Sequence, residues 1–232
     1  MKFPCRLDKF ISNLAEIPRT HAKAAIKKKR VTVNGEVTRQ LDQAVTEQDE
    51  IMLDGELITY QGLRYFMLNK PEGFVCANSD ELHATVFELL DEPNLSELHI
   101  AGRLDIDTTG LVLISNDGQW SHQITSPKKQ KFKTYLVELA EPLSEQAVSE
   151  LEQGVQLHGE RDLTLPAKVE VLAPYQIRLH IVEGKYHQVK RMLAAVGNKV
   201  VTLHREAIAG IELDPDLAPG EYRLLSEEEI AL

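Results

Sequence analysis

The sequence predicts an α+β protein with two domains, a small basic one over residues 1–60 and a larger acidic one over residues 61–232. Its 232 residues suit one or two domains of about 150 residues each, and a composition of 43% apolar and 27% charged residues is typical of globular proteins. The first 40 residues hold ten Lys and Arg against three Asp and Glu, so the net charge of −10 divides into +7 there and −17 in the remainder. Such asymmetry indicates a basic binding module attached to an acidic body.

Two short helices are expected at the start of the first domain. Apolar residues recur at helical spacing over residues 7–15, and Pro18 ends that run. Thr20 is a suitable N-cap for a second helix through Ile26, whose other positions are mostly cationic. The rest of the domain is expected to contain short strands, hairpin turns at residues 34–35 and 54–55, and a linker at residues 59–64.

Strands dominate the second domain. Strands are expected over residues 65–68, 111–115, 135–139, 169–172, 177–181 and 200–203, and several of them alternate apolar with polar residues as half-buried strands do. Helices are expected over residues 144–153 and 187–196, each followed by a glycine. The pattern predicts a largely antiparallel mixed sheet flanked by helices.

Several classes of function are disfavoured by what the sequence lacks. No apolar stretch reaches the roughly 18 to 20 residues of a membrane helix, and no signal peptide is recognisable, so we expect a cytoplasmic protein with no membrane partner. Cys5 and Cys76 are expected to be free thiols. No metal site is expected, because the eight histidines have no ligand spacing, and the common nucleotide-binding and hydrolase motifs are absent.

The most unusual segment is HIAGRLDIDTTGLVLISNDG, residues 99–118. It places Arg103, Asp105 and Asp107 in a loop between two buried strands, where a rigid sheet can present a carboxylate in a cleft. Two other interpretations stay open here. One is an ordinary loop in which the aspartates bond backbone N–H groups and the arginine pairs with an acid. The other is a glycosidase or metal site built on both aspartates.

A second segment, EGKYHQVKRMLAAVG over residues 183–197, carries two cations beside the apolar stripe of its expected helix. Lys190 and Arg191 lie near the start of that helix, and one of them can reach inward. A carboxylate in a partly dry pocket needs such a cation, because burial alone raises its pKa. The alternative is a solvated basic patch.

A third segment, KFKTYLVEL over residues 131–139, places Tyr135 in phase with Val137 and Leu139 on one side of a strand. A core aromatic is the simplest interpretation. If that side borders the cleft, the ring is a platform for a flipped-out base, and stacking there is worth about 1 to 3 kcal/mol.

Taken in order, these segments resemble known families. Residues 6–58 resemble the S4 RNA-binding domain, and YFMLNKPEGFVC, GRLDIDTTGLVLISNDG, KTYLV and EGKYHQVKRMLAAVG resemble the RsuA family of RNA pseudouridine synthases. Within that family the chain length, DIDTTGLVL, DGQWSHQITSP and GKYHQVKRM are most similar to the branch that modifies small-subunit 16S rRNA. The resemblance implies an S4-like domain linked to a pseudouridine synthase domain.

The resemblance also implies roles for single residues. Asp105 matches the catalytic aspartate of the GRLD motif, and Arg103 matches the arginine associated with flipping the target nucleotide. Tyr135 matches the tyrosine that stacks on the target base and is a candidate for moving the C5 proton. Lys190 matches the basic residue that pairs with the aspartate, and Arg191 is a second candidate because related enzymes often have arginine there.

The remaining expected contacts concern the pocket wall and the RNA backbone. Leu193 is expected to help form the wall of the pocket, and Asp107 matches a position associated with loop structure. The S4-like domain is expected to bind RNA through six cations: Arg6, Lys9, Arg19, Lys23, Lys27 and Arg30.

The reaction implied by the resemblance is the isomerisation of a uridine to pseudouridine, which needs no cofactor because no group is donated and no net redox change occurs. The expected substrate is uridine 516 of 16S rRNA in a small-subunit assembly intermediate, and the expected enzyme is a monomer. Two alternatives stay open. One is a synthase that acts on 23S rRNA, and the other is a non-catalytic S4-domain ribosome assembly factor.

Overall fold

The computed structural model describes residue 1, residues 3–126 and residues 129–232. These residues form two compact units: unit 1 is Met1–Arg64 with Asp91–His99 and Ser115–Asp117, and unit 2 is the remainder. Lys2, one of the ten N-terminal cations, and Pro127, the last residue of DGQWSHQITSP, lie outside the described residues. No helix in the described ranges is long and apolar enough to cross a membrane.

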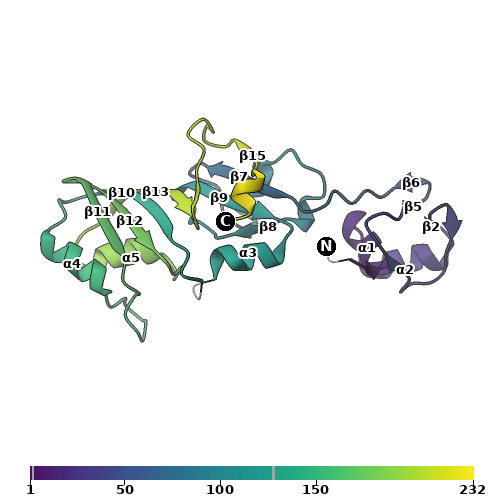
Figure 1. Cartoon of the computed structure of the whole chain (residues 1–232), viewed down its shortest axis with the longest axis horizontal. Helices are drawn as coiled ribbons and strands as arrows, with labels where there is room; N and C mark the ends of the chain where they lie inside the picture. Colours follow the sequence, from purple (N-terminus) through teal and green to yellow (C-terminus); the bar gives the residue numbers. More distant parts are fainter. Residues whose placement is uncertain (2, 127–128) are drawn as a thin grey trace. The chain divides into compact units, whose positions relative to one another are not determined.

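Unit 1 consists of short helices and short strands (Figure 1). Its elements are β1 (Cys5–Arg6), α1 (Leu7–Leu14), α2 (Arg19–Lys27), β2 (Val31–Val33), β3 (Glu36–Val37), β4 (Ala44–Val45), β5 (Ile51–Leu53), β6 (Glu56–Leu57) and the 3-10 helix η2 (Leu95–Glu97). The strands form an antiparallel sheet of order β3-β2-β5-β6 and a separate β1-β4 pair. The apolar faces of α1 and α2 share one core with β2, β4 and β5, which explains the apolar spacing noted in the sequence.

The start of α2 differs from the sequence-based expectation. The helix begins at Arg19, and Pro18 rather than Thr20 occupies the N-cap position. Proline suits the beginning of a helix because the first turn requires no N–H donor there. The predicted cap at Thr20 is therefore wrong, and this residue lies inside the first turn.

Unit 2 is built on a mixed sheet of order β11-β12-β10-β13-β9-β7-β15, with β14 beside β13 and β8 beside β9 (Figure 1). The strands are β7 (Tyr65–Lys70), β8 (His99–Ala101), β9 (Thr109–Ser115), β10 (Lys133–Leu139), β11 (Lys168–Ala173), β12 (Gln176–Ile181), β13 (Val200–Ile208), β14 (Ile211–Glu212) and β15 (Tyr222–Leu224). The helices are η1 (Val86–Leu89), α3 (Gly118–Thr125), α4 (Glu145–Gln153), α5 (Gln188–Ala195) and α6 (Glu227–Ile230). Strands β9 and β13 run parallel, whereas β10 runs antiparallel to both of its neighbours. The predicted mixed, mostly antiparallel sheet with helices is confirmed.

Helix α3 was not expected from the sequence. Its residues include Gly118, Ser121 and Thr125, which have weak helix propensity. Its position is decided by packing, because Trp120 and Ile124 are buried in the same core as β7 and β9. Tertiary burial, which a local pattern does not show, stabilises this helix.

Candidate active site

Unit 2 contains an open cleft of about 890 Å³. The cleft is lined by residues 75–77 after β7, the loop between β8 and β9, two residues each from β10 and β13, and the segment that leads into α5. Asp105, Tyr135, Lys190 and Arg103, all selected from the sequence, are among the lining residues. These four residues, of which Arg103 and Lys190 are 87 positions apart in the sequence, thus share one concave surface.

The Asp105 carboxylate lies between two basic side chains. Lys190 Nζ is 3.1 Å from Oδ2, and His187 Nε2 is 3.5 Å from Oδ1. Burial by itself lowers the pKa of Lys190, but its hydrogen bonds to Asp107 and Asp105 outweigh burial and raise that pKa, so the amine stays charged. The Asp105 side chain is 29% exposed, which leaves a paired carboxylate that a substrate can still reach.

Asp107 shares the same ammonium group. Its Oδ1 is 2.6 Å from Lys190 Nζ, and this contact outweighs the effect of burial and lowers the pKa of Asp107. Residues 105 and 107 are two positions apart, so an extended segment would place both side chains on one side. The chain turns here, and the Thr108 N–H donates to the Asp105 carbonyl at 3.1 Å. Both carboxylates converge on one lysine.

Arg103 is exposed at the cleft, and no ion pair joins it to another residue in the described part of the chain. The ordinary-loop interpretation required this arginine to pair with an acid. Its guanidinium is instead open to an anionic ligand such as a phosphate.

Arg191 and Leu193 are not brought to the cleft. The Arg191 guanidinium is 3.2 Å from Glu160 Oε1 and donates hydrogen bonds to the carbonyls of His158 and Tyr186. Leu193 is fully buried in the core beneath α5. Successive residues of a helix point about 100° apart, so Lys190 faces the aspartates while Arg191 faces the segment around Glu160. Direct substrate contact by Arg191 or Leu193 stays a prediction that this geometry does not favour.

Two buried cations, missed from the sequence, hold the aspartate loop, which we define as residues 102–108. Arg205, 1% exposed, donates from Nη2 to the Gly102 carbonyl at 2.6 Å, from Nε to the Leu111 carbonyl at 2.8 Å, and from Nη1 to the Arg103 carbonyl at 3.4 Å. Its interactions tie the start of the loop to β9. Because the guanidinium is buried, losing it would leave the Leu111 carbonyl and its loop acceptors without this donor.

Lys70 fixes the other end of the aspartate loop. Its ammonium is fully buried and donates to the carbonyls of Thr108 at 2.7 Å, Pro71 at 3.0 Å and Ile106 at 3.2 Å. Burial lowers the pKa of Lys70, and the nearby Cys76 and Asp107 partly oppose this. A lone lysine at the end of an apolar strand gives a weak signal in the sequence, since it is more often a solvated strand end.

Gly110 permits the close approach of β9 and β13. Its φ is +100°, and a Cβ at this position would lie 2.3 Å from the Arg205 backbone oxygen. Only glycine fits both the conformation and the space. A glycine inside an apolar strand pattern is a recognised sign of such close backbone approach, so the sequence did contain this signal.

Tyr135 lies in the cleft with only 7% of its surface exposed. The Arg205 guanidinium carbon is 6.0 Å from the centroid of its ring. Lys133 lies on the same face of β10 and also lines the cleft, and burial together with repulsion by Arg205 lowers its pKa. The cleft thus combines an aromatic ring with several cations, a combination suited to a nucleotide.

In unit 1, the predicted RNA-binding cations fall into two groups. Arg6, Arg19 and Lys23 surround the fully buried Asp8 at 3.1, 3.1 and 4.0 Å. Burial raises the pKa of Asp8, but the hydrogen bonds and charges of Arg6 and Arg19 more than reverse this and hold its pKa at about 2. The cations themselves stay about half exposed, so they can also meet solvent or RNA.

The other three cations lie on the surface of unit 1. Lys9 and Lys27 are exposed on α1 and α2, and Arg30 forms an exposed ion pair with Asp54. None of these three is buried, which suits contact with a phosphate backbone.

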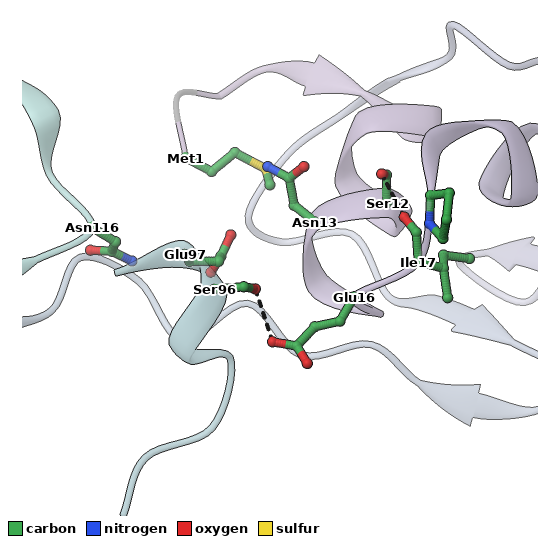
Figure 2. A pocket seen from close by; sticks show the side chains of 9 residues that line it. Met1, Ser12, Asn13, Glu16, Ile17, Ser96, Glu97 and Asn116 are labelled. Atoms are coloured by element: carbon green, nitrogen blue, oxygen red, sulfur yellow. Dashed lines mark hydrogen bonds between the residues drawn. The ribbon is translucent and has the colours of Figure 1, made fainter. Parts of the chain in front are cut away.

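A separate pocket of about 680 Å³ lies within unit 1 (Figure 2). Ser96 donates a hydrogen bond to Glu16 across it at 2.8 Å, and Figure 2 shows Glu97 beside them. Burial raises the pKa of Glu97. Because its charged side chains are carboxylates, this pocket is a poor site for RNA.

The fold and the cleft together define an RNA-modifying enzyme that carries its own RNA-binding module, and comparison with known families identifies the class. Residues 5–51 match the S4 domain, and residues 64–195 match the RNA pseudouridylate synthase family. The chain belongs to the RNA pseudouridylate synthases, in the RsuA family, and is an enzyme of that class.

Individual relatives agree with this assignment. The chain is 56% identical over 227 residues to "Ribosomal small subunit pseudouridine synthase A" of Escherichia coli (strain K12), covering 97% of this chain and 98% of the relative. It is 52% identical to the protein of the same name from Vibrio vulnificus (strain CMCP6), covering 97% of each. A solved structure described as "Crystal structure of pseudouridylate synthase" superposes with a TM-score of 0.71 at 49% identity and 98% coverage of both chains.

Proposed function

We propose that this chain converts a uridine of small-subunit rRNA, uridine 516 of 16S rRNA, into pseudouridine in an assembling small subunit. The observation that carries the proposal is the Asp105 carboxylate, which is paired with Lys190 yet open to a cleft that also holds Tyr135. The names of the relatives, which are small-subunit pseudouridine synthases, support this choice of RNA.

The reaction exchanges one bond for another within a single nucleotide. The bond between N1 and C1′ breaks, the uracil turns within the site, and a bond forms between C5 and C1′. The proton on C5 leaves and N1 gains a proton, so the product is an isomer of the substrate. The enzyme must therefore hold the detached uracil and accept and return protons.

We assign Asp105 the central role in this exchange. Attack on C1′, attack on C6 and removal of a ribose proton are three possible first steps, and each requires an ionised carboxylate near the sugar. Lys190 Nζ lies 3.1 Å from the carboxylate and would hold it in position toward the cleft. Tyr135 would stack on the extruded uracil and is a candidate for moving the C5 proton.

The remaining residues would deliver the nucleotide. Arg103 at the cleft would hold a phosphate beside the flipped base, since its guanidinium has no ion-pair partner within the described residues. The exposed cations of unit 1, which include Lys9 and Lys27, would bind the RNA backbone. We place the boundary between the two functions near residue 60, with residues 1–60 binding RNA and residues 61–232 performing the reaction.

The proposal is tested by mapping pseudouridine in 16S and 23S rRNA after incubation of small-subunit assembly intermediates and large-subunit RNA with the wild-type chain. Asp105→Asn, which retains the size of the side chain, is the matched inactive control. We expect one new modified position, uridine 516 of 16S rRNA, with the wild type and none with the variant.

Other outcomes would change the proposal in specific ways. A modified uridine in 23S rRNA would keep the chemistry and overturn the proposed substrate. Modification that survives Asp105→Asn would remove the aspartate from its role. RNA binding with no modified position would favour the non-catalytic assembly factor.

A further inference from the structure

An exposed tyrosine lies at the cleft, and the reaction as derived does not use it. Tyr186 is 75% exposed, the second most exposed of the large apolar and aromatic side chains in the described residues, and it is one of the lining residues of the cleft. Its ring stacks on the imidazole of His187, with a centroid separation of 3.7 Å and an interplanar angle of 21°. A single exposed ring is ordinary on a protein surface, but an exposed ring that lines a nucleotide-sized cleft offers a face on which a base can stack.

The position of this pair connects it to the reaction centre. His187 contacts Tyr186 through its ring, and its Nε2 is 3.5 Å from Asp105 Oδ1. A single imidazole thus separates the tyrosine ring from the carboxylate. A base that stacked on Tyr186 would therefore lie in the same cleft as the target nucleotide, on the side of His187.

The backbone around the pair is held in place. The Tyr186 carbonyl accepts a hydrogen bond from Arg191 Nη1 at 2.9 Å, and the Lys185 N–H donates to Gln188 Oε1 at 2.8 Å. Gln188 in turn donates to the buried Glu183 at 2.7 Å. His187 adopts a left-handed conformation with φ of +47°, which is uncommon for a residue with a side chain. Such a conformation is retained where the surroundings enforce it, often at functional sites.

From this geometry we propose that Tyr186, supported by His187, is a stacking platform for the base of a nucleotide that flanks the target uridine in single-stranded RNA. The inference rests on the proposed function, because it takes the strand in the cleft to be the substrate RNA. Base stacking on an exposed aromatic ring tolerates any base, so the platform would fix the position of the strand rather than read its sequence. Arg191 would act as a positioning residue by holding the Tyr186 carbonyl, which gives this cation a role away from the aspartate.

The test compares steady-state kinetics of pseudouridine formation on small-subunit assembly intermediates for the wild type, Tyr186→Ala, Tyr186→Phe and Tyr175→Ala. Tyr175 is a matched control, because it is 53% exposed and lies between β11 and β12, outside the cleft. We expect Tyr186→Ala to raise KM about ten-fold, while kcat changes less than about two-fold. Tyr186→Phe keeps the ring and should restore most of the lost affinity.

A spectroscopic measurement reports stacking directly. RNA fragments that carry 2-aminopurine on either side of the target uridine are bound to the Asp105→Asn chain, with and without Tyr186→Ala. We expect the fluorescence of one of the two probes to be quenched on binding, and the quenching to be lost in the Tyr186→Ala double variant. The probes are placed beside whichever uridine the mapping experiment identifies.

The outcomes separate this inference from the proposed function. If Tyr186→Ala behaves like Tyr175→Ala in KM and leaves the quenching unchanged, the platform is wrong although the synthase activity stands. If the wild-type chain modifies no uridine, the proposed function fails first. A fall in kcat with unchanged KM would also overturn the platform, because it would place Tyr186 in the chemical step.

Discussion

Two aspartates in this molecule lie among basic side chains, one in each unit, and they differ in what their partners leave accessible. Asp8 in unit 1 is fully buried and accepts two hydrogen bonds each from Arg6 and Arg19. Asp105 in unit 2 keeps 29% of its side chain exposed and has Lys190 at 3.1 Å and His187 at 3.5 Å. Cations around a carboxylate therefore do not by themselves indicate catalysis.

Accessibility distinguishes the two cases. The oxygens of Asp8 are saturated by two guanidinium groups, so this carboxylate organises the surface of unit 1. Asp105 faces a cleft, and its ammonium partner Lys190 is shared with Asp107. We expect substitution of Asp8 to affect stability and RNA binding, and substitution of Asp105 to affect the reaction.

The largest expected effect is on the rate. Asp105→Asn should lower kcat for pseudouridine formation by at least about a thousand-fold, because the amide cannot act as a nucleophile or base. The same variant should bind RNA with wild-type affinity and show unchanged hydrogen exchange in unit 2. A stability loss as large as the one expected for Asp8 would mean that the two aspartates do not differ in the way described.

The next largest expected effect is a difference in kcat between variants of the two adjacent cations of α5, Lys190 and Arg191. Lys190→Met should lower kcat about a hundred-fold, since the carboxylate loses the ammonium partner that positions it. Arg191→Met should cost less than about ten-fold and act mainly on KM, because its guanidinium contacts Glu160 and the Tyr186 carbonyl. Kinetics of both variants on the same RNA check this order, and equal losses in kcat would contradict it.

A smaller effect, on stability, is expected in unit 1. Asp8→Asn leaves three cations around a neutral amide, and we expect it to destabilise unit 1 by about 2 kcal/mol. The matched control is Asp54→Asn, which removes an exposed ion pair with Arg30 and should change stability much less. Hydrogen exchange of the amides of α1 and α2 measures the free energy of opening within this unit alone. Equal losses in the two variants would show that burial of Asp8 contributes nothing.

The smallest expected effect is a pH dependence of the stability difference between the wild type and Asp8→Asn. The pKa of Asp8 is lowered from 3.8 to about 2, so its ionised form stabilises the folded state above about pH 4. This contribution is lost as the pH falls from about 4 to about 2, because the unfolded chain takes up the proton first. The stability difference between the wild type and Asp8→Asn should shrink over that range. A difference that stays constant across it would contradict the role of the ion cluster.

The sequence predicted the side chains that line the cleft better than the buried cations that hold the aspartate loop. Asp105, Tyr135 and Lys190 were selected from loop position, strand phase and helix position together with the family resemblance, and all three line one cleft. Arg205 and Lys70 were missed because a single cation in a strand resembles a solvent-facing residue. Their role depends on carbonyls that approach only after folding.

Other differences have similarly physical causes. The shared contact of Asp105 and Asp107 with Lys190 depends on how close the loop at residues 105–108 comes to α5, which strand alternation does not indicate. The position of Arg191 depends on the rotation of α5 about its axis, which the apolar stripe defines only to within one residue. Sequence patterns indicate which face of an element is buried, whereas pairing of charges depends on distances between elements.

The hydrogen bonds of Arg205 and Lys70 also limit how the enzyme can meet its substrate. These two buried cations donate hydrogen bonds to five backbone carbonyls, those of Pro71, Gly102, Arg103, Ile106 and Thr108. The aspartate loop therefore has little freedom to adjust. Under the proposed function, adaptation on binding would fall to the RNA, which would bend and unstack to bring a uridine to the Asp105 carboxylate. Uridines that are already weakly stacked, as in a partly assembled ribosomal particle, would be modified most readily, and those in regular helices would be spared.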